Sequence, residues 1–367
     1  MGFESGSASF RVFYAPGGQP GDCLERFARC AAPPLDKLGS DPISGWVTGR
    51  HLLDRDIREE TAIMAGFLRL TLMKAERKIP ESLLRAECKM EEFAEMAAKG
   101  VATLDRGTRA EIKRSVTERL FPNMPPTLTG IPLVWKNDAD QLYAGALSEK
   151  QNDALLIAFQ QAVSQPLVPM TPAAAAMRRK QIDVRVLGPT SFSPEFEHEL
   201  MGGETIGEDF LTWLWFFSEA RGGIARIPDI GEFGVMLEGP LLFFRDGDGA
   251  HETQLRNGMP LVSSEAKTAL LSGKKLRRAK LTLALGDASW TVSFDAREFI
   301  FRGLKPPKAQ PMDAISRFEQ RMFSIRTFTD ALLGFYDRFL DERTDADAWS
   351  KTVAEIHKWV ADRQGRA

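Results

Sequence analysis

Apolar and polar side chains alternate along two segments of the N-terminal half, and a period of two predicts β-strands. The first segment covers residues 9–15 and reads SFRVFYA. The second covers residues 61–73, where leucine occupies every second position from Leu68 to Leu72. The side chains between these leucines are Arg69 and Thr71, so this second strand is expected to have one polar face.

Apolar positions three and four residues apart predict amphipathic helices in several other segments. One begins after Pro80, which suits the first turn of a helix. Two others begin at capping boxes, formed by Thr108 with Glu111 and by Ser148 with Gln151, in which each side chain satisfies a free backbone N–H. The predicted helices cover residues 80–99, 108–120, 148–163, 263–271, 312–342 and 348–363.

Short polar turns join two further pairs of predicted strands. Residues 136–140 connect 131–135 to 141–147, and Gly286-Asp287 connects 281–285 to 289–294. Antiparallel strands can be joined by such short turns, whereas parallel strands cannot. The expected fold class is therefore α+β, with antiparallel sheets and flanking helices in two or three lobes.

The chain of 367 residues is long enough for more than one core, since a domain holds roughly 100–200 residues. Three prolines between residues 166 and 172 mark the clearest internal boundary. We predict four segments: 1–60, an N-terminal extension with an opening strand; 61–172, a first α+β lobe with long charged helices; 173–308, a second α+β lobe with an acidic segment and a basic hairpin; and 309–367, a C-terminal helical region.

Composition narrows the class of protein. Hydrophobic residues make up 43% and charged residues 27%, which is typical of globular chains and argues against global disorder. The chain contains no uncharged apolar run of about 18 residues, so we expect no membrane-spanning helix. The three cysteines are loosely spaced, which indicates neither a disulfide framework nor a zinc site, and we expect a cytoplasmic protein.

The net charge of −2 conceals a strong segregation of charge along the chain. Residues 191–255 contain thirteen acidic and three basic residues, whereas residues 256–308 contain eleven basic and four acidic ones. Such segregation can create a basic surface on a protein that is acidic overall.

Four basic clusters are the candidate phosphate-binding groups. They are Lys74, Arg77 and Lys78 (the first cluster); Arg106, Arg109, Lys113, Arg114 and Arg119 (the second); Arg178, Arg179, Lys180 and Arg185 (the third); and Lys274, Lys275, Arg277, Arg278 and Lys280 (the fourth). The fourth is the densest, with no acidic residue between Glu265 and Asp287. From the first, second and fourth clusters we select as candidate DNA-binding residues Lys74, Arg77, Lys78, Arg109, Lys113, Arg114, Lys274, Lys275, Arg277, Arg278 and Lys280.

No motif predicts catalysis, a metal or a cofactor, so we expect a protein that is not an enzyme. His198 lies among acidic residues at 195, 197 and 199, and Asp246-Gly-Asp248-Gly resembles part of a calcium loop. We interpret the first as a solvated acidic loop and the second as a turn. The acidic segment 191–255 also leaves open a metal-dependent nuclease, in which paired carboxylates would hold the cation.

The order of features from residue 60 to 340 resembles the bacterial recombination-associated RdgC proteins. A strand leads into a basic run and Ile79-Pro80, and a long charged helix follows. The shared features continue along the chain in this order: Glu111-Ile-Lys113, Leu120-Phe121-Pro122, Val134-Trp135, a strand at 142–147, Gln165-Pro166-Leu167-Val168-Pro169, Phe210-Leu-Thr-Trp213, a helix at 264–269, Gly273-Lys274 and a strand at 280–285.

This resemblance implies a cytoplasmic, nucleoid-associated protein without catalytic activity. Members of the family form a ring-shaped homodimer with a positively lined hole, bind single- and double-stranded DNA without strong sequence preference, and restrain RecA-type strand exchange. The matching basic positions are Lys74, Arg77, Lys113, Lys274 and Lys280. The chain departs from the family at residues 123–125, where Asn-Met-Pro replaces an arginine followed by an aromatic residue.

Two functional hypotheses follow. The first is a homodimeric DNA-binding protein that holds DNA through phosphate contacts and whose function intersects with RecA. The second is a protein-interaction or scaffold module, whose basic hairpin binds an acidic partner. Salt-dependent DNA binding distinguishes the first from the second.

Overall fold

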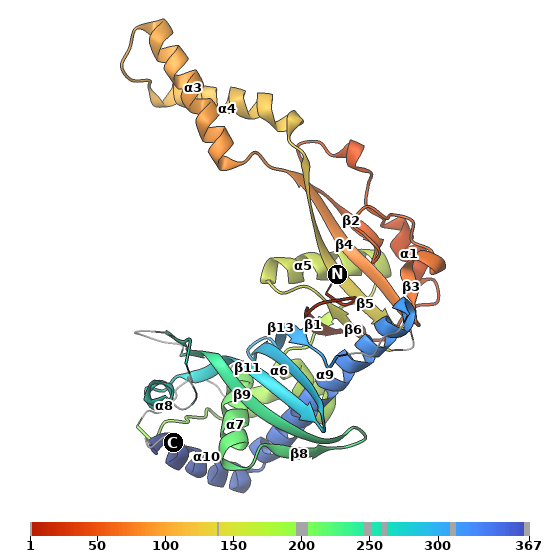
Figure 1. Ribbon diagram of the computed structural model, residues 1–367, viewed down its shortest axis with the longest axis vertical. Coiled ribbons are helices and arrows are strands. Elements are labelled where there is room, and N and C mark those ends of the chain that lie inside the picture. The colour runs from red at the N-terminus through yellow and green to blue at the C-terminus, as the bar shows by residue number, and fades with distance from the viewer. Residues whose placement is uncertain are drawn as a thin grey trace.

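The molecule is elongated, with a helical hairpin at one end and most of the helices at the other (Figure 1). This computed structural model describes residues 2–137, 139–195, 205–245, 251–258, 261, 263–308 and 313–362. The fold is α+β, and its strands form antiparallel ladders. This confirms the predicted fold class.

The N-terminal sheet has the strand order β1-β6-β5-β4-β2, with every neighbouring pair antiparallel. Its leucines and aromatic residues pack against α1 and α5. The elements of this half are β1 (Ala8–Tyr14), α1 (Cys23–Arg29), β2 (Ile43–Thr48), α2 (Glu59–Ala62), β3 (Ile63–Met64), β4 (Phe67–Arg77), β5 (Pro126–Lys136), β6 (Gln141–Ala144), α5 (Glu149–Val163) and β7 (Val168–Pro169), with short 3₁₀ turns at Leu35–Lys37 and Phe121–Asn123.

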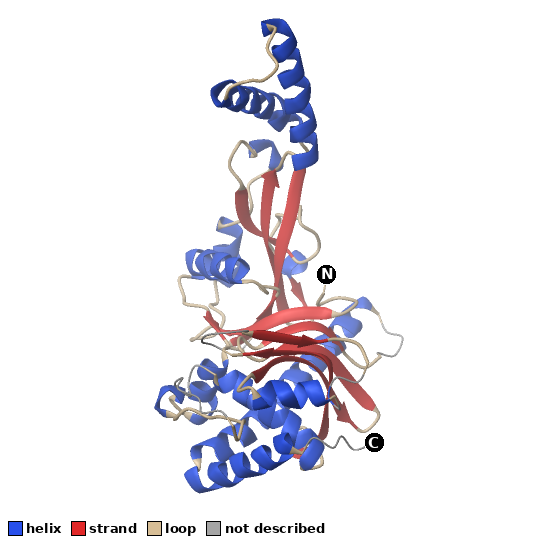
Figure 2. Ribbon diagram, turned by 90° about the vertical axis from the view of Figure 1, so that its left-hand side faces the viewer, coloured by secondary structure: helices blue, strands red, loops and turns tan. Residues whose placement is uncertain are grey.

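The C-terminal sheet has the strand order β10-β9-β11-β12-β13, and β8 pairs with β9. The described helices of this half cluster on one side of it (Figure 2). The elements are α6 (Pro172–Lys180), a 3₁₀ turn at Val184–Val186, α7 (Ile206–Ala220), β8 (Ile224–Ile227), β9 (Gly231–Phe244), β10 (Glu252–Leu255), α8 (Ser264–Leu271), β11 (Lys275–Leu285), β12 (Ala288–Asp295), β13 (Ile300–Lys305), α9 (Ala314–Thr344) and α10 (Ala346–Ala361).

Strand β1 connects the two sheets. Its first half pairs with β13, where Phe10 lies opposite Phe301, and its second half pairs with β6 from Arg11 to Tyr14. The Phe10 ring lies 5.0 Å from that of Phe301 and 5.5 Å from that of Tyr143, measured between ring centroids. Residues near the N-terminus therefore lie at the centre of the molecule. Whether the four predicted segments form separate lobes stays a prediction.

Helix α7 is the most deeply buried helix of the C-terminal half. Every residue from Ile206 to Phe217 is buried, and the aromatic side chains pack against β11, α9 and α10. These aromatic residues therefore build the core, because large apolar rings gain the most from leaving water. Helix α9 runs beside this core, and its Tyr336 and Phe339 rings contact Phe210.

Two helices form the tip hairpin, which projects from the far ends of β4 and β5 (Figures 1 and 2). They are α3 (Glu81–Lys99) and α4 (Arg106–Leu120). The predicted capping box of Thr108 and Glu111 is wrong. The N-cap of α4 is Asp105, whose carboxylate accepts a hydrogen bond from the Thr108 backbone N–H, so the capping residue lies three positions earlier than the sequence pattern indicated.

The other predicted elements are largely confirmed. Ser148 and Gln151 form the capping box of α5, and the Gly286-Asp287 turn joins β11 to β12. One boundary differs in a way that affects function. The strand predicted over 281–285 begins earlier, so that the basic run from Lys275 is part of β11 and pairs with β9.

This placement buries Lys275 beneath the first turn of α7. Its side chain is 4% exposed, and its Nζ lies 2.5 Å from Oδ1 of Asp209, which is fully buried. The same Nζ donates a hydrogen bond to Thr205 Oγ1 at 2.8 Å. The adjacent Glu208 is also buried, with Arg297 Nε 3.7 Å from its Oε1, and burial raises the pKa of Glu208 to about 7.

We predict that Lys275→Ala lowers the free energy of unfolding by about 3–5 kcal/mol, because it removes the ammonium that faces the buried Asp209 carboxylate. Urea denaturation measures the loss. The control is Lys280→Ala, which breaks the more exposed pair with Glu238 and should cost less than about 1 kcal/mol. Equal stability of the two variants would contradict the prediction.

Candidate nucleic-acid interface

The first basic cluster lies where β4 leads into the tip hairpin. Lys74 Nζ lies 2.6 Å from Glu76 Oε2, and Lys78 forms an ion pair with the other oxygen of the same carboxylate. Arg77 donates a hydrogen bond to the carbonyl of Pro122, in the 3₁₀ turn that follows α4. The two hydrogen bonds from the lysines lower the pKa of Glu76 to about 2, so it remains ionised at any physiological pH.

The second cluster lies on α4 and has most of its charge free. Among the described residues, only Arg119 has acidic partners, at 2.9 Å from Glu87 and 3.2 Å from Glu91 of α3. The remaining members are exposed and form no ion pair with any described residue. These four are Arg106, Arg109, Lys113 and Arg114.

The third cluster is neutralised within the fold. Its members pair with carboxylates, mostly from distant parts of the sequence, and each therefore contributes little net charge to the surface. The pairs are Arg178 with Asp140, Arg179 with Asp337, Lys180 with Asp341 and Arg185 with Asp183.

The fourth cluster is also largely paired. Arg278 Nη2 lies 2.6 Å from Asp295 Oδ2, and Arg277 Nε lies 3.6 Å from the other oxygen of Asp295. Lys280 Nζ lies 2.5 Å from Glu238 Oε2 on the neighbouring strand β9. The run from 274 to 280 contains no acidic residue, but carboxylates from neighbouring strands pair with its cations.

The first two lysines of the fourth cluster differ in exposure. Lys274 is partly exposed, donates a hydrogen bond to Thr253, and has its pKa lowered by burial and by the nearby Arg245. Lys275 is buried against Asp209, so its ammonium does not face solvent.

Arg302 is a basic residue that the sequence patterns did not single out. Lys280 lies opposite Ser293 on β12, which in turn lies opposite Arg302 on β13. This row is on the face opposite the buried side chains of Leu281 and Leu283, because side chains alternate along a strand. The hairpin turn predicts the register of Lys280 with Ser293, but no local signal pairs β12 with Arg302.

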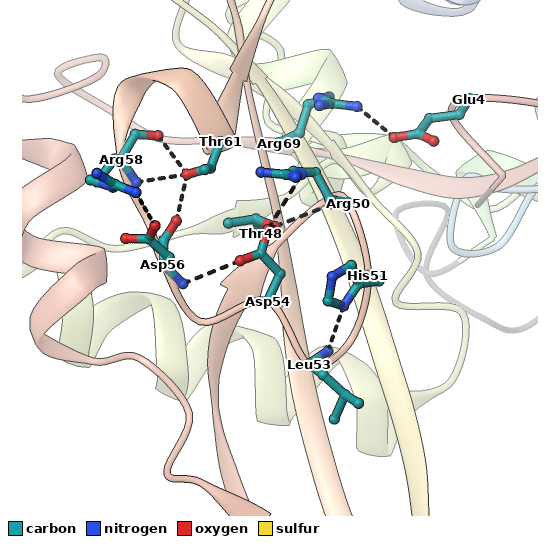
Figure 3. Close-up of polar contacts among 10 residues, drawn as sticks. All are labelled: Glu4, Thr48, Arg50, His51, Leu53, Asp54, Asp56, Arg58, Thr61 and Arg69. Carbon is teal, nitrogen blue, oxygen red and sulfur yellow. Dashed lines mark hydrogen bonds and ion pairs between the residues drawn. The ribbon is translucent and has the colours of Figure 1, made fainter.

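Arginines around the loop between β2 and α2 are also held by acidic residues (Figure 3). Thr48 Oγ1 donates a hydrogen bond of 2.6 Å to Asp54 Oδ2, which helps to fix that loop. We assign these charges a structural role. The ion pairs are Arg50 with Asp54, Arg58 with Asp56 and Arg69 with Glu4.

The structure thus brings the first two clusters together at one end of the molecule and places the fourth on the other sheet (Figure 1). Among the described residues, no group of three His, Cys, Asp or Glu side chains is arranged to hold a metal ion. The described part of the chain also contains no helix able to cross a bilayer. His198, Glu197, Glu199, Asp246 and Asp248 lie outside the described residues.

Comparison with known proteins adds no family. No protein-family model matches the chain, and no curated protein matches it. The resemblance to RdgC proteins therefore rests on the quoted residues, and it stays a prediction.

We predict that Glu76→Gln strengthens binding to a DNA duplex several-fold and steepens the salt dependence, because it frees Lys74 and Lys78 for about one or two more phosphate contacts. Fluorescence anisotropy across a salt titration measures both effects. The control Glu232→Gln removes an exposed acid on β9 and should change neither. An unchanged salt slope for Glu76→Gln would exclude the first cluster from the interface.

Proposed function

We propose that this protein binds single- and double-stranded DNA without sequence specificity, as a homodimer that closes around the DNA. The proposal includes no catalytic step and no cofactor. In this proposal the protein acts at the nucleoid, and the DNA it occupies is withheld from RecA-type strand exchange.

The exposed cations of α4 carry the proposal. Arg106, Arg109, Lys113 and Arg114 lie on a projecting hairpin, and no described acidic residue pairs with them. Phosphate contacts from such residues release counterions, which makes binding strong at low salt and independent of sequence. An overall charge of −2 does not oppose this, because the field near the tip depends on the local charges.

The open face of the C-terminal sheet is a second supporting surface. Arg278, Lys280 and Arg302 are partly exposed there. Arg302 donates a hydrogen bond to the Leu147 carbonyl, and burial together with the charge of Arg278 lowers its pKa without removing its positive charge. Asp295 and Glu238 reduce the charge of this face, so we assign it a weaker contribution than the tip.

The apolar face of α3 supports association of two copies. Met90 is 60% exposed and Phe93 is 63% exposed, because α3 packs only one of its sides against α4. Two helices alone cannot bury the apolar positions on all their faces. A second copy would cover these side chains, and the resemblance to a ring-forming family agrees with this arrangement.

We predict that the triple variant Arg109→Ala, Lys113→Ala and Arg114→Ala weakens duplex binding by about tenfold or more at low salt and flattens the slope of log affinity against log salt by about two to three. Fluorescence anisotropy with a random-sequence duplex measures this.

The matched control removes three exposed cations outside the tip, Arg55, Arg226 and Lys351, which form no ion pair with described residues. This control variant should retain most of the affinity. Equal losses in the two variants would show that only total charge matters and would overturn the assignment to the tip.

We also predict that Phe93→Ser converts the dimer to a monomer without unfolding it, since its side chain is exposed in the single chain. Sedimentation velocity measures the mass, and Ile157→Ser, which changes a 60% exposed residue on α5, is the control. An unmodified protein that sediments as a monomer would contradict the dimer.

The same apolar face favours the protein-interaction hypothesis, with a different protein as the partner. The sequence predicted that the basic hairpin binds the acidic partner. However, Asp209, Asp295 and Glu238 already neutralise much of the positive charge of this hairpin. A protein that associates through Phe93 but binds no DNA at low salt would support this alternative over our proposal.

A further inference from the structure

Phe323 interrupts the amphipathic pattern of α9. It is 69% exposed, whereas its neighbours Phe318, Met322 and Phe328 are buried in the core. A phenylalanine ring gains stability when it leaves water, so the exposed face of Phe323 is a surface on which a flat apolar ligand can gain by stacking.

The Phe323 ring lines a hollow of about 540 Å³. The other apolar walls come from the β11–β12 hairpin and from the chain that follows β13, through Trp290, Pro306 and Pro307. Trp290 is fixed in place, because its indole N–H donates to the Ser324 carbonyl at 3.0 Å and to the Ser324 hydroxyl at 2.8 Å. The volume falls within the range of small-ligand sites.

Cations surround this hollow. Lys305, Lys308, Arg317 and Arg321 all contribute to its lining. The acidic lining residue is Glu4, whose carboxylate is paired with Arg69 at 2.5 Å.

These cations differ in their contacts. The exposed lysines Lys305 and Lys308 form no ion pair with any described residue. Arg321 donates to the carbonyls of Gly2 and Gly6, which fixes the N-terminal wall of the hollow. The hollow thus combines an aromatic surface with available positive charge.

We propose that this hollow binds an unpaired base of single-stranded DNA, with the base stacked on Phe323 and the flanking phosphates at Lys305 and Lys308. This inference rests on the proposed DNA-binding function. Every base presents a π-face, so the site tolerates any sequence, and the cations neutralise the backbone. A duplex keeps its bases stacked inside and cannot offer one to Phe323, so the site favours single strands over duplexes.

The test is Phe323→Ala, measured by fluorescence anisotropy with a single-stranded thymine oligonucleotide and with a duplex. We expect about tenfold weaker binding to the single strand and unchanged binding to the duplex. Phe323→Trp retains a stacking surface and should restore single-strand affinity. The control is Ile315→Ala, which changes a 57% exposed residue of the same helix outside the hollow and should alter neither affinity.

A second measurement reports stacking directly. A single strand carrying 2-aminopurine should lose fluorescence when it binds the unmodified protein, and this quenching should be absent with Phe323→Ala. Suppose that the unmodified protein binds both DNAs. If Phe323→Ala then leaves the affinity for the single strand unchanged, or lowers the affinity for the single strand and the duplex equally, only this inference is overturned. If the unmodified protein binds neither DNA, the proposed function fails and this inference fails with it.

Discussion

The main-chain hydrogen bonds of β1 hold the two halves of the molecule together. One strand of seven residues pairs with β13 at its start and with β6 at its end, so neither sheet is complete without it. Flexing the molecule at this junction would break pairing on one side of β1, because its start is held by β13 and its end by β6. If two copies form a ring, DNA would therefore enter by separation of the copies at a contact between them, with the shape of each subunit preserved.

The distribution of free charge depends on the fold more than on the sequence. The fourth cluster has no acidic residue among its neighbours in the chain, yet Asp209, Glu238 and Asp295 approach it from α7, β9 and β12. Charge counting along the sequence could not find these partners, since they come from elements that meet only after folding. The cations of α4 remain free for the opposite reason: a projecting hairpin contacts few other elements.

Local patterns predicted most elements, because strand alternation, helical spacing and the α5 capping box depend on neighbouring residues alone. They also predicted the register of the β11–β12 hairpin, through its two-residue turn. They failed where competition or long-range packing decides. Asp105 caps α4 because its carboxylate reaches the Thr108 backbone N–H. The hollow beside Phe323 forms only where α9 meets the β11–β12 hairpin and the chain after β13, so no local pattern predicts it.

Burial of Glu208 links the folding of this protein to proton uptake. Its pKa is about 7 in the folded chain and near 4.5 when the chain is unfolded, so folding between these two pH values draws a proton from solution. The group imposes no penalty below pH 4.5. The loss grows as the pH rises from 4.5 to 7, where this group has ionised in the unfolded chain but still holds its proton in the folded chain. Above pH 7 the loss levels off at about 3 kcal/mol, at 1.36 kcal/mol for each unit of pKa. Glu208 thus weakens the packing at the first turn of α7 least when it is protonated and most above neutral pH.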